Sequence, residues 1–241
     1  MWKATIYTLF PDMFPGSLGQ SIAGKALQQG KWGLKTVNIR DYALDKHKTV
    51  DDTSYGGGTG MVMRPDVVNN ALRENFIPGT KLIYTSPKGK TMTQSMIRSW
   101  LDDYPDGISI LCGRYEGVDQ RVIESWQETH ELEEVSIGDY VLSGGDIAAL
   151  VILDACVRLL PGVLEKVDAT TIESFELDLL EYPQYTKPQI WNNKVVPDVL
   201  LSGDHKKIAA WRKDEAENIT KSRRPDLWQV YQAKNRVGVK D

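Results

Sequence analysis

Three glycine-bearing loops contain the residues best suited to bind a ligand. They span residues 84–89, 113–119 and 136–146, and each follows a short apolar run that we expect to form a strand. In a parallel sheet, ligands bind at the carboxyl ends of the strands, where such loops lie together. Glycines let the backbone approach a ligand closely, and the apolar residues between them suit a flat ring. One such loop is usually a tight turn, whereas three at neighbouring strand ends make a shared pocket equally plausible.

Two common nucleotide-binding signatures fail in this sequence. Residues 89–91 read Gly-Lys-Thr, as at the end of a phosphate-binding P-loop, but the glycine required at position 84 is replaced by Tyr84. The first expected strand runs into Leu-Phe-Pro-Asp-Met at 9–13 rather than into a GxGxxG turn. The usual dinucleotide-binding architecture, which most methyltransferases and dehydrogenases share, is therefore not expected.

A separate glycine run, Tyr-Gly-Gly-Gly-Thr-Gly-Met, occupies residues 55–61. It follows Asp51 and Asp52 and precedes a helix that Pro65 opens. Such a stretch is either a flexible lid or an anion-binding nest at the start of a helix. A plain mobile loop explains this segment equally well.

The elements that position these loops alternate along the chain. Hydrophobic periodicity and turn residues predict strands at 3–10, 34–40, 81–85, 108–112 and 132–135. They predict helices at 21–29, 65–76, 93–103, 119–127 and 146–160. Alternation of this kind predicts an α/β fold with a mainly parallel sheet that is covered on both faces.

The pattern changes after Pro161 and Gly162. Pro183, Pro188 and Pro197 forbid long regular elements, so we expect an interdomain linker at 162–201. Beyond it, Ser202 or Asp204 is suited to cap a helix toward residue 222, and a second helix begins at Pro225. The expected layout is a large domain at 1–161 and a small all-α domain at 202–241.

Composition indicates an ordinary globular protein with an uneven charge. The 241 residues carry a net charge of −4, yet the segment from His205 onward has ten basic residues against five acidic ones. Charge alone favours a solvated helical surface over phosphate binding there. Neither a signal peptide nor a run of about 18 apolar residues occurs, so we expect a cytoplasmic protein without a membrane partner. Cys112 and Cys156 form no CxxC and no metal pattern, and we expect both in the core.

Several motifs taken together resemble the bacterial tRNA (guanine-N1)-methyltransferases, which belong to the knotted SPOUT class and use S-adenosylmethionine. The match extends over nearly the whole chain and includes the segments 9–14, 55–61, 84–89, 111–117, 136–145, 161–163, 174–175, 185–188 and 224–227, with Arg158. The resemblance implies a trefoil knot formed by the loops of residues 84–145, although knots are rare in proteins. It also implies a homodimer with active sites between the subunits, and a linker and C-terminal domain that grip tRNA. It thereby strengthens the phosphate-binding reading of the basic C-terminal segment.

The resemblance further implies a role for individual residues. The carboxylate of Glu173 would act as general base, and Arg158 would stabilise the guanine O6. S-adenosylmethionine would contact Tyr84, Thr85, Ser86, Pro87, Gly113, Tyr115, Glu116, Ser136, Ile137, Gly138, Asp139, Tyr140, Val141, Leu142, Gly144 and Gly145. The tRNA would contact Asp51, Gly58, His205 and Lys207. The resemblance suggests a magnesium ion without naming its ligands, and we assign no metal-binding residue.

The proposed chemistry explains why a base and a cation are needed. Methylation of guanine N1 requires removal of a proton, and the electrons left behind move partly onto O6. Many relatives have aspartate at the position of Glu173, so the carboxylate here is one methylene longer; Asp168 is the alternative base. Glu116 and Glu181 would face the methionine end of the cofactor, although a plain surface role is equally plausible for Glu181. Thr59, Asp146 and Ala148 also depart from the commoner pattern, and we expect them to alter loop stiffness rather than chemistry.

Three functions are compatible with these residues. The first is methylation of guanine N1 at tRNA position 37, immediately 3′ of the anticodon. The second is a related knotted enzyme that methylates another RNA site, and the third is a non-catalytic RNA-binding protein. A binding protein has no need for both a carboxylate and an arginine at these positions, so the sequence favours the first.

Overall fold

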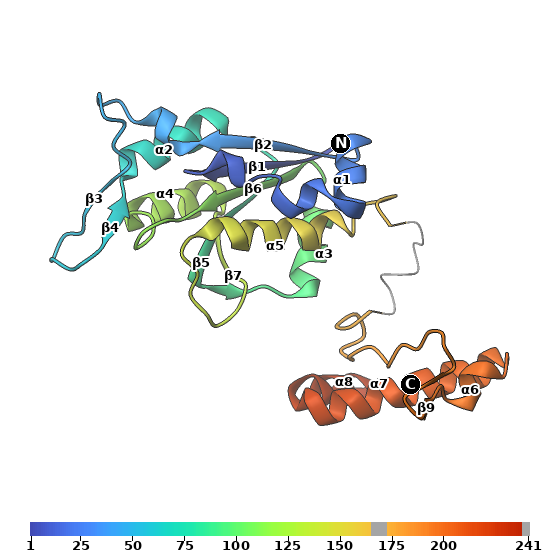
Figure 1. Ribbon diagram of the computed structural model, residues 1–241. Helices are drawn as coiled ribbons and strands as arrows, with labels where there is room; N and C mark the ends of the chain where they lie inside the picture. Colours follow the sequence, from blue (N-terminus) through green and yellow to red (C-terminus); the bar gives the residue numbers. More distant parts are fainter. Residues whose placement is uncertain (165–172, 238–241) are drawn as a thin grey trace. The chain divides into compact units, whose positions relative to one another are not determined.

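The computed structural model describes residues 1–164 and 173–237, and it divides into two compact units, Met1–Glu165 and Lys166–Asp241. The first unit is built on a five-stranded sheet in the order β2-β1-β6-β5-β7 (Figure 1). Its strands are β1 (Trp2–Thr8), β2 (Trp32–Asn38), β5 (Lys81–Thr91), β6 (Gly107–Cys112) and β7 (Glu133–Ser136). All four neighbouring pairs are parallel, which confirms the expected α/β fold with a parallel sheet.

Helices cover both faces of this sheet. On one face, buried residues of α1 (Ser21–Gln28), α3 (Gln94–Asp103) and α5 (Gly145–Val157) form one hydrophobic core with the strands. On the other face, α2 (Pro65–Asn75) and α4 (Gln120–His130) form a second core. Adjacent residues of β1 divide between them, since Ile6 belongs to the first core and Tyr7 to the second. Every residue of β6, the middle strand, is buried, as expected for a parallel sheet covered on both sides.

Local signals in the sequence set most helix boundaries. Pro65 occupies the first turn of α2, and the side chain of Thr93 caps α3 by accepting from the N–H of Met96. The carboxylate of Asp119 caps α4 in the same way. Gly30 ends the segment after α1 with a φ of +67°. These helices therefore begin and end within a residue or so of the predicted positions, except that α4 extends to His130 and α5 ends at Val157, with Arg158 as its C-cap.

Strand β5 is longer than predicted. It continues through Thr91, and its register against β7 shifts between Thr85 and Lys90. Gly89 makes this pairing possible, because a Cβ there would lie 2.4 Å from the backbone of Glu134 and Val135. The segment 86–89, which we expected to be a loop, is therefore part of the sheet and extends the wall beside β7.

Several short elements were not predicted. Strands β3 (Asp51–Thr53) and β4 (Met61–Met63) form an antiparallel hairpin, and its tip is made by residues 54–60, which contain the glycines of the run 55–61. The 3-10 turns η1 (Pro11–Met13), η2 (Gly16–Gly19) and η3 (Ile39–Tyr42) follow β1 and β2. In the hairpin tip, Gly56, Gly57 and Gly58 all have positive φ, which glycine adopts at little cost.

The second unit contains a short hairpin followed by helices. Strands β8 (Ile190–Trp191) and β9 (Lys194–Val195) and helix α6 (Asp198–Leu201) lie in the segment expected to be a linker. Asn192 and Asn193 adopt left-handed conformations, which lets two residues close the hairpin. Helices α7 (His205–Arg223) and α8 (Pro225–Val237) follow where helices were predicted, and Asp204 caps the first of them. In the described ranges, every helix is too short or too polar to cross a membrane.

Candidate active site

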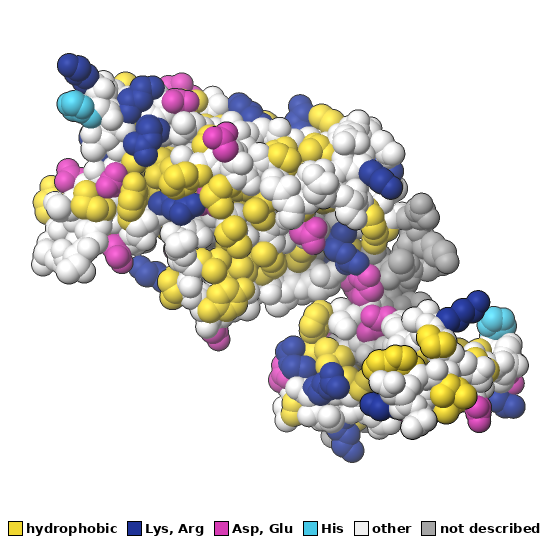
Figure 2. All heavy atoms as spheres, viewed as in Figure 1, with side chains coloured by type: hydrophobic (Ala, Val, Ile, Leu, Met, Phe, Trp, Pro, Cys, Tyr) yellow, Lys and Arg dark blue, Asp and Glu magenta, His cyan; other side chains and the backbone are white. Residues whose placement is uncertain are grey.

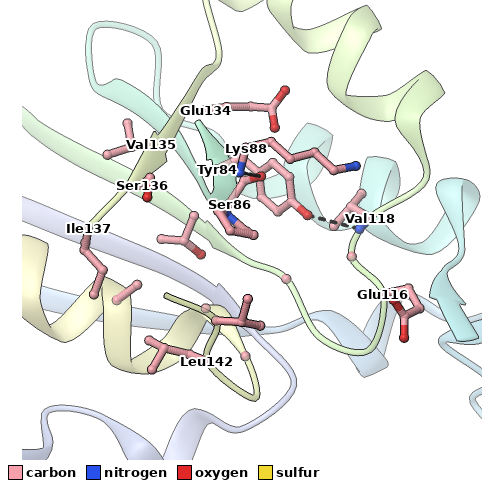
Figure 3. Close-up of a pocket in the computed structure, with 18 of the residues that line it drawn as sticks. Tyr84, Ser86, Lys88, Glu116, Val118, Glu134, Val135, Ser136, Ile137 and Leu142 are labelled. Carbon is pink, nitrogen blue, oxygen red and sulfur yellow. Dashed lines mark hydrogen bonds between the residues drawn. The ribbon is translucent and has the colours of Figure 1, made fainter. Parts of the chain in front are cut away.

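A cavity of about 330 Å³ lies at the carboxyl ends of β5, β6 and β7 (Figure 3). Its lining residues lie within the segments 84–88, 113–120 and 134–148, which are the three loops that the sequence singled out together with their neighbours. Ile137 and Leu142 lie on one side of it, and Tyr84 with Val118 lies on the other. This size is at the lower end of the range for small-molecule sites, and the mixed polar and apolar lining suits a molecule with a flat ring and a polar tail.

Nearly all residues expected to contact the cofactor line this cavity. Asp139 is the exception, and it is exposed at the turn that follows Gly138, whose φ is +145°. Sequence reasoning missed other lining residues, which are Lys88, Gly117, Val118, Gln120, Glu134, Val135 and Ala148. Lys88, Gly117 and Val118 belong to the loops 84–89 and 113–119 that the sequence singled out, and the others lie in or beside the strands and helices that these loops join.

Tyr84 forms a wall against which the loop 113–117 packs. Its hydroxyl accepts a hydrogen bond from the N–H of Val118 at 3.2 Å. A Cβ at Gly113 would lie 3.0 Å from the tyrosine ring, and one at Gly117 would lie 2.9 Å from its hydroxyl. Burial raises the pKa of Tyr84 above its ordinary value, so the phenol stays protonated. At positions 113 and 117, a side chain would push the ring of Tyr84 aside, so glycine lets the backbone pass close to it.

The loop that follows β7 folds back on itself. The hydroxyl of Ser136 donates to the carbonyl of Gly138 at 3.0 Å and accepts from the N–H of the same residue at 3.2 Å. A Cβ at Gly138 would lie 2.6 Å from the ring of Tyr140. Tyr140, Val141 and Leu142 are exposed, although all three also line the cavity. The loop thus presents apolar groups both to the cavity and to the outside.

Arg114 and Asp146 join two of these loops behind the cavity wall. The guanidinium Nε of Arg114 lies 2.7 Å from Oδ2 of Asp146, whose side chain is fully buried. Thr8, the last residue of β1, donates a hydrogen bond to the other carboxylate oxygen. A Cβ at Gly144 would lie 2.4 Å from the Arg114 guanidinium, so this glycine leaves the space that the arginine occupies. We expected Asp146 to affect loop stiffness only, and its pairing with Arg114 was missed.

The β3–β4 hairpin is attached to the cavity at its base. The N–H of Glu116 donates to the carbonyl of Met61 at 2.9 Å, and the N–H of Met63 donates to the carbonyl of Gly117 at 2.9 Å. A Cβ at Gly60 would lie 2.1 Å from the side chain of Glu116, which therefore rests on the hairpin backbone. Of the residues expected to meet tRNA, Asp51 lies in β3 and Gly58 lies in the glycine tip.

The two expected catalytic residues lie in different units. Arg158 is the C-cap of α5, at the opposite end of that helix from the cavity-lining Gly145. With a rise of about 1.5 Å per residue, their backbones are about 20 Å apart. Glu173 is partly buried in the second unit, where its carbonyl accepts from the N–H of Glu176 at 3.3 Å. Asp168, the alternative base, lies outside the described residues.

The remaining predicted residues lie in the second unit. His205 and Lys207 occupy the first turn of α7, and both are exposed. The Lys207 ammonium lies 3.5 Å from the carboxylate of Asp204. The N–H of Glu181 donates to the hydroxyl of Ser174 at 3.0 Å, and its side chain is exposed. Over residues 1–164 and 173–237, no group of three or more histidine, cysteine or acidic side chains is arranged to hold a metal ion, so no ligands can be assigned to magnesium.

Comparison with known proteins places these features in a family. The model of the family described as tRNA (Guanine-1)-methyltransferase TrmD matches residues 2–230. A protein of Ruegeria sp. (strain TM1040) is 52% identical over 238 residues, covering 97% of this chain and 95% of its own length. One of Rhodopseudomonas palustris (strain TIE-1) is 56% identical over 228 residues (94% and 90%), and one of Brucella ovis is 54% identical over 235 residues (98% and 94%). All three are named tRNA (guanine-N(1)-)-methyltransferase.

Proposed function

Because this chain belongs to the tRNA (guanine-1)-methyltransferase family, we propose that it methylates N1 of guanine in tRNA, at position 37. The observation that carries the proposal is the cavity at the ends of β5, β6 and β7, whose walls are the glycine-bearing loops of the family motifs. A dinucleotide-binding architecture is not supported, because β1 is followed by a 3-10 turn rather than by a glycine-rich turn.

S-adenosylmethionine fits this cavity, and it would supply the methyl group from its sulfonium. Gly113, Gly117 and Gly138 line the cavity with backbone alone, while Ile137, Leu142 and Ala148 offer apolar contacts to an adenine ring. Glu116 lines the same cavity and is suited to face the positively charged methionine end.

We also infer the trefoil knot of the SPOUT class. Support comes from the close contact between the loops that would form it, since the N–H of Gly145 donates to the carbonyl of Gly113 at 2.8 Å. Arg114 and Gly144 pair in an antiparallel bridge beside this contact. A Cβ at Gly145 would lie 2.0 Å from the Thr85 hydroxyl, so the three loops pack directly on one another.

We assign the base to Glu173 and charge stabilisation to Arg158. A carboxylate that removes the N1 proton contributes roughly 10²–10⁴-fold to the rate. A guanidinium directed at O6 stabilises the negative charge that develops there as the proton leaves. Holding guanine N1 in line with the methyl group supplies much of the remaining acceleration.

The position of Arg158 supports active sites that are shared between two subunits. Of the α5 residues that line the cavity, Ala148 is the nearest to Arg158 in sequence, and their backbones are about 15 Å apart along the helix, which exceeds the reach of an arginine side chain. Helix α5 also exposes Ile147 and Val151, and the loop before it exposes Val141 and Leu142. Hydrophobic side chains gather over this part of the first unit (Figure 2). An exposed apolar surface of this kind is typical of a protein interface. We infer a homodimer in which one subunit binds the methyl donor and its partner supplies Arg158 and Glu173.

The tRNA would contact both units of the protein. Asp51 and Gly58 of the β3–β4 hairpin would approach the target guanine or its neighbour, because the base of that hairpin is bonded to the cavity loop. His205 and Lys207, at the exposed start of α7, would meet the phosphate backbone. We accordingly take 1–161 as the catalytic domain, 162–201 as the linker and 202–241 as a tRNA-binding domain. A tRNA substrate also implies a cytoplasmic location.

A methyl-transfer assay tests this function directly. Labelled S-adenosylmethionine is supplied with a tRNA transcript that carries guanine at position 37, and in parallel with the same transcript carrying adenine there. We expect label only in the guanine transcript, located at N1 by nuclease digestion and chromatography. Equal labelling of both transcripts would favour a related enzyme with another target site, and binding without labelling would favour a non-catalytic RNA-binding protein.

A further inference from the structure

The buried carboxylate of Asp146 connects three segments that meet behind the cavity. Thr8 ends β1, Arg114 follows the cavity-lining Gly113, and Asp146 is the second residue of α5. The Thr8 hydroxyl donates to one carboxylate oxygen, and the Arg114 Nε lies 2.7 Å from the other. The same threonine hydroxyl accepts from the N–H of Phe10 at 2.9 Å, so the chain leaving β1 is also fixed.

The remaining side-chain contacts of Arg114 are with residues that do not line the cavity. Its guanidinium carbon lies 4.3 Å from the centre of the Phe10 ring, and its NH2 lies 3.3 Å from the sulfur of Met13. Neither Arg114 nor Asp146 lines the cavity, whereas Gly113, Tyr115, Gly144 and Gly145, their sequence neighbours, all do. The pair thus acts on the backbone on either side of it.

The geometry of the glycines shows what the pair holds together. The space that Arg114 fills exists only because position 144 has no side chain, and Gly145 packs so closely that its N–H reaches the Gly113 carbonyl. A shift of either loop would break the ion pair and this backbone contact together. The two loops are therefore locked in one register at the point where both enter the cavity wall.

A buried ion pair is a costly way to obtain stability alone. Removing two charges from water is expensive, and a well-packed apolar pair often stabilises a fold equally well. What the ion pair adds is geometric specificity, because the guanidinium donor and the carboxylate acceptor can form their hydrogen bond in only a narrow range of relative positions. Loss of one partner, in contrast, leaves an uncompensated charge in the interior.

We propose that Arg114 and Asp146 are a positioning pair, which holds the loops 113–119 and 136–145 in the register that binds the methyl donor. This inference rests on the proposed function, since it assigns the two residues to the S-adenosylmethionine site. Thr8 orients the carboxylate from the far side. None of the three residues would touch the donor itself.

The test compares the variant Arg114→Met with the double variant Arg114→Met/Asp146→Asn. The single variant leaves a buried carboxylate without its partner, so we expect the larger fall in melting temperature. In the double variant the uncompensated charge is gone, and most of the lost thermal stability should return. The directional constraint stays absent, so binding of S-adenosylmethionine, measured by calorimetry, should remain at least about tenfold weaker than in the parent protein.

Lys81→Met is the matched control. Lys81 is buried and lies 2.9 Å from Glu133 at the start of β5, and neither residue lines the cavity. We expect a comparable loss of thermal stability with donor affinity within about twofold of the parent. In the methyl-transfer assay, the double variant should raise the KM for S-adenosylmethionine and leave the KM for tRNA unchanged.

The outcomes separate the two proposals. Donor affinity that recovers together with melting temperature in the double variant, or that never falls, would overturn the positioning role while leaving the proposed function intact. A parent protein that does not bind S-adenosylmethionine would overturn both. If Arg114→Met does not fold, the affinity for S-adenosylmethionine is measured in the double variant and in Thr8→Val instead. Thr8→Val should weaken donor binding severalfold.

Discussion

The hydroxyl of Tyr84 lies 3.2 Å from the backbone nitrogen of Val118, and the loop between Gly113 and Gly117 passes across the same ring. Tyr84 lies in β5, and Val118 lies in the loop between β6 and α4, so this one contact ties that loop to the neighbouring strand. Any side chain on the intervening glycines would have to displace the ring. The cavity therefore depends on these glycines for its shape as well as for close backbone approach.

Gly117→Ala should accordingly weaken binding of S-adenosylmethionine by tenfold or more. Gly117 has a φ of +110°, and an added Cβ would lie 2.9 Å from the Tyr84 hydroxyl. Backbone strain of this kind costs on the order of 1–3 kcal/mol before the clash is counted. Gly79→Ala is the control, because its φ is +85° but its nearest neighbour would be 3.5 Å away. Calorimetric affinities that fall equally in both variants would show that strain alone, and not the contact with Tyr84, is responsible.

Local chemistry made much of the fold predictable. The proline of α2, the side-chain caps at Thr93 and Asp119, and the glycine after α1 each act within a few residues, and the elements begin or end there. The extension of β5 was not predictable in this way. Pro87 and Gly89 read as a loop, and only the distant backbone of β7 makes that segment a strand.

The site was predictable to a similar degree. Strand-end loops and the family motifs indicated most of the cavity lining, whereas Glu134 and Val135 enter it from within β7, through the pairing of that strand with β5. The contacts of Asp146 could not be predicted from the sequence. Its partners Thr8 and Arg114 are 138 and 32 residues away in the sequence, and no local pattern reports such a contact.

Glu173→Gln should abolish methyl transfer while donor binding is retained. The amide keeps the size of the side chain but cannot accept the N1 proton, so the expected loss is roughly 10²–10⁴-fold in kcat. Single-turnover kinetics with the guanine-37 transcript measure it. Asp168→Asn is the companion variant, and an active Glu173→Gln beside an inactive Asp168→Asn would transfer the role of base to Asp168.

Lys207→Ala should weaken tRNA binding in a salt-dependent way. If Lys207 neutralises one phosphate, its removal lowers the slope of log affinity against log salt concentration by about 1. The fold should persist, because Asp204 caps α7 through the backbone N–H groups of Lys206 and Lys207, which the substitution leaves in place. Lys234→Ala is the control, since the Lys234 ammonium lies 2.5 Å from Asp178 in the same unit, closer than the 3.5 Å between Lys207 and Asp204. An unchanged slope in Lys207→Ala, measured by filter binding, would remove Lys207 from the phosphate contacts.

The first unit should lose stability as the pH rises above about 9, because its thiols are buried in the protonated form. Burial raises the pKa of Cys156 to about 12 and that of Cys112 well above its ordinary value. In the unfolded chain a thiol ionises near pH 8.5, so the unfolded state binds fewer protons than the native state above that pH. The stabilisation is therefore complete below the unfolded pKa and is lost as the pH rises toward the folded pKa.

For Cys156 at pH 10 this loss amounts to on the order of 1–2 kcal/mol. Urea unfolding at pH 8 and pH 10 measures it, and Cys156→Ala should show a smaller difference between the two values even though its cavity lowers both. Buried thiols should also react slowly with a disulfide reagent in the native protein and rapidly in denaturant. Rapid labelling of native Cys156 at pH 8 would contradict its burial, and an equal pH dependence in Cys156→Ala would assign the alkaline loss to other groups.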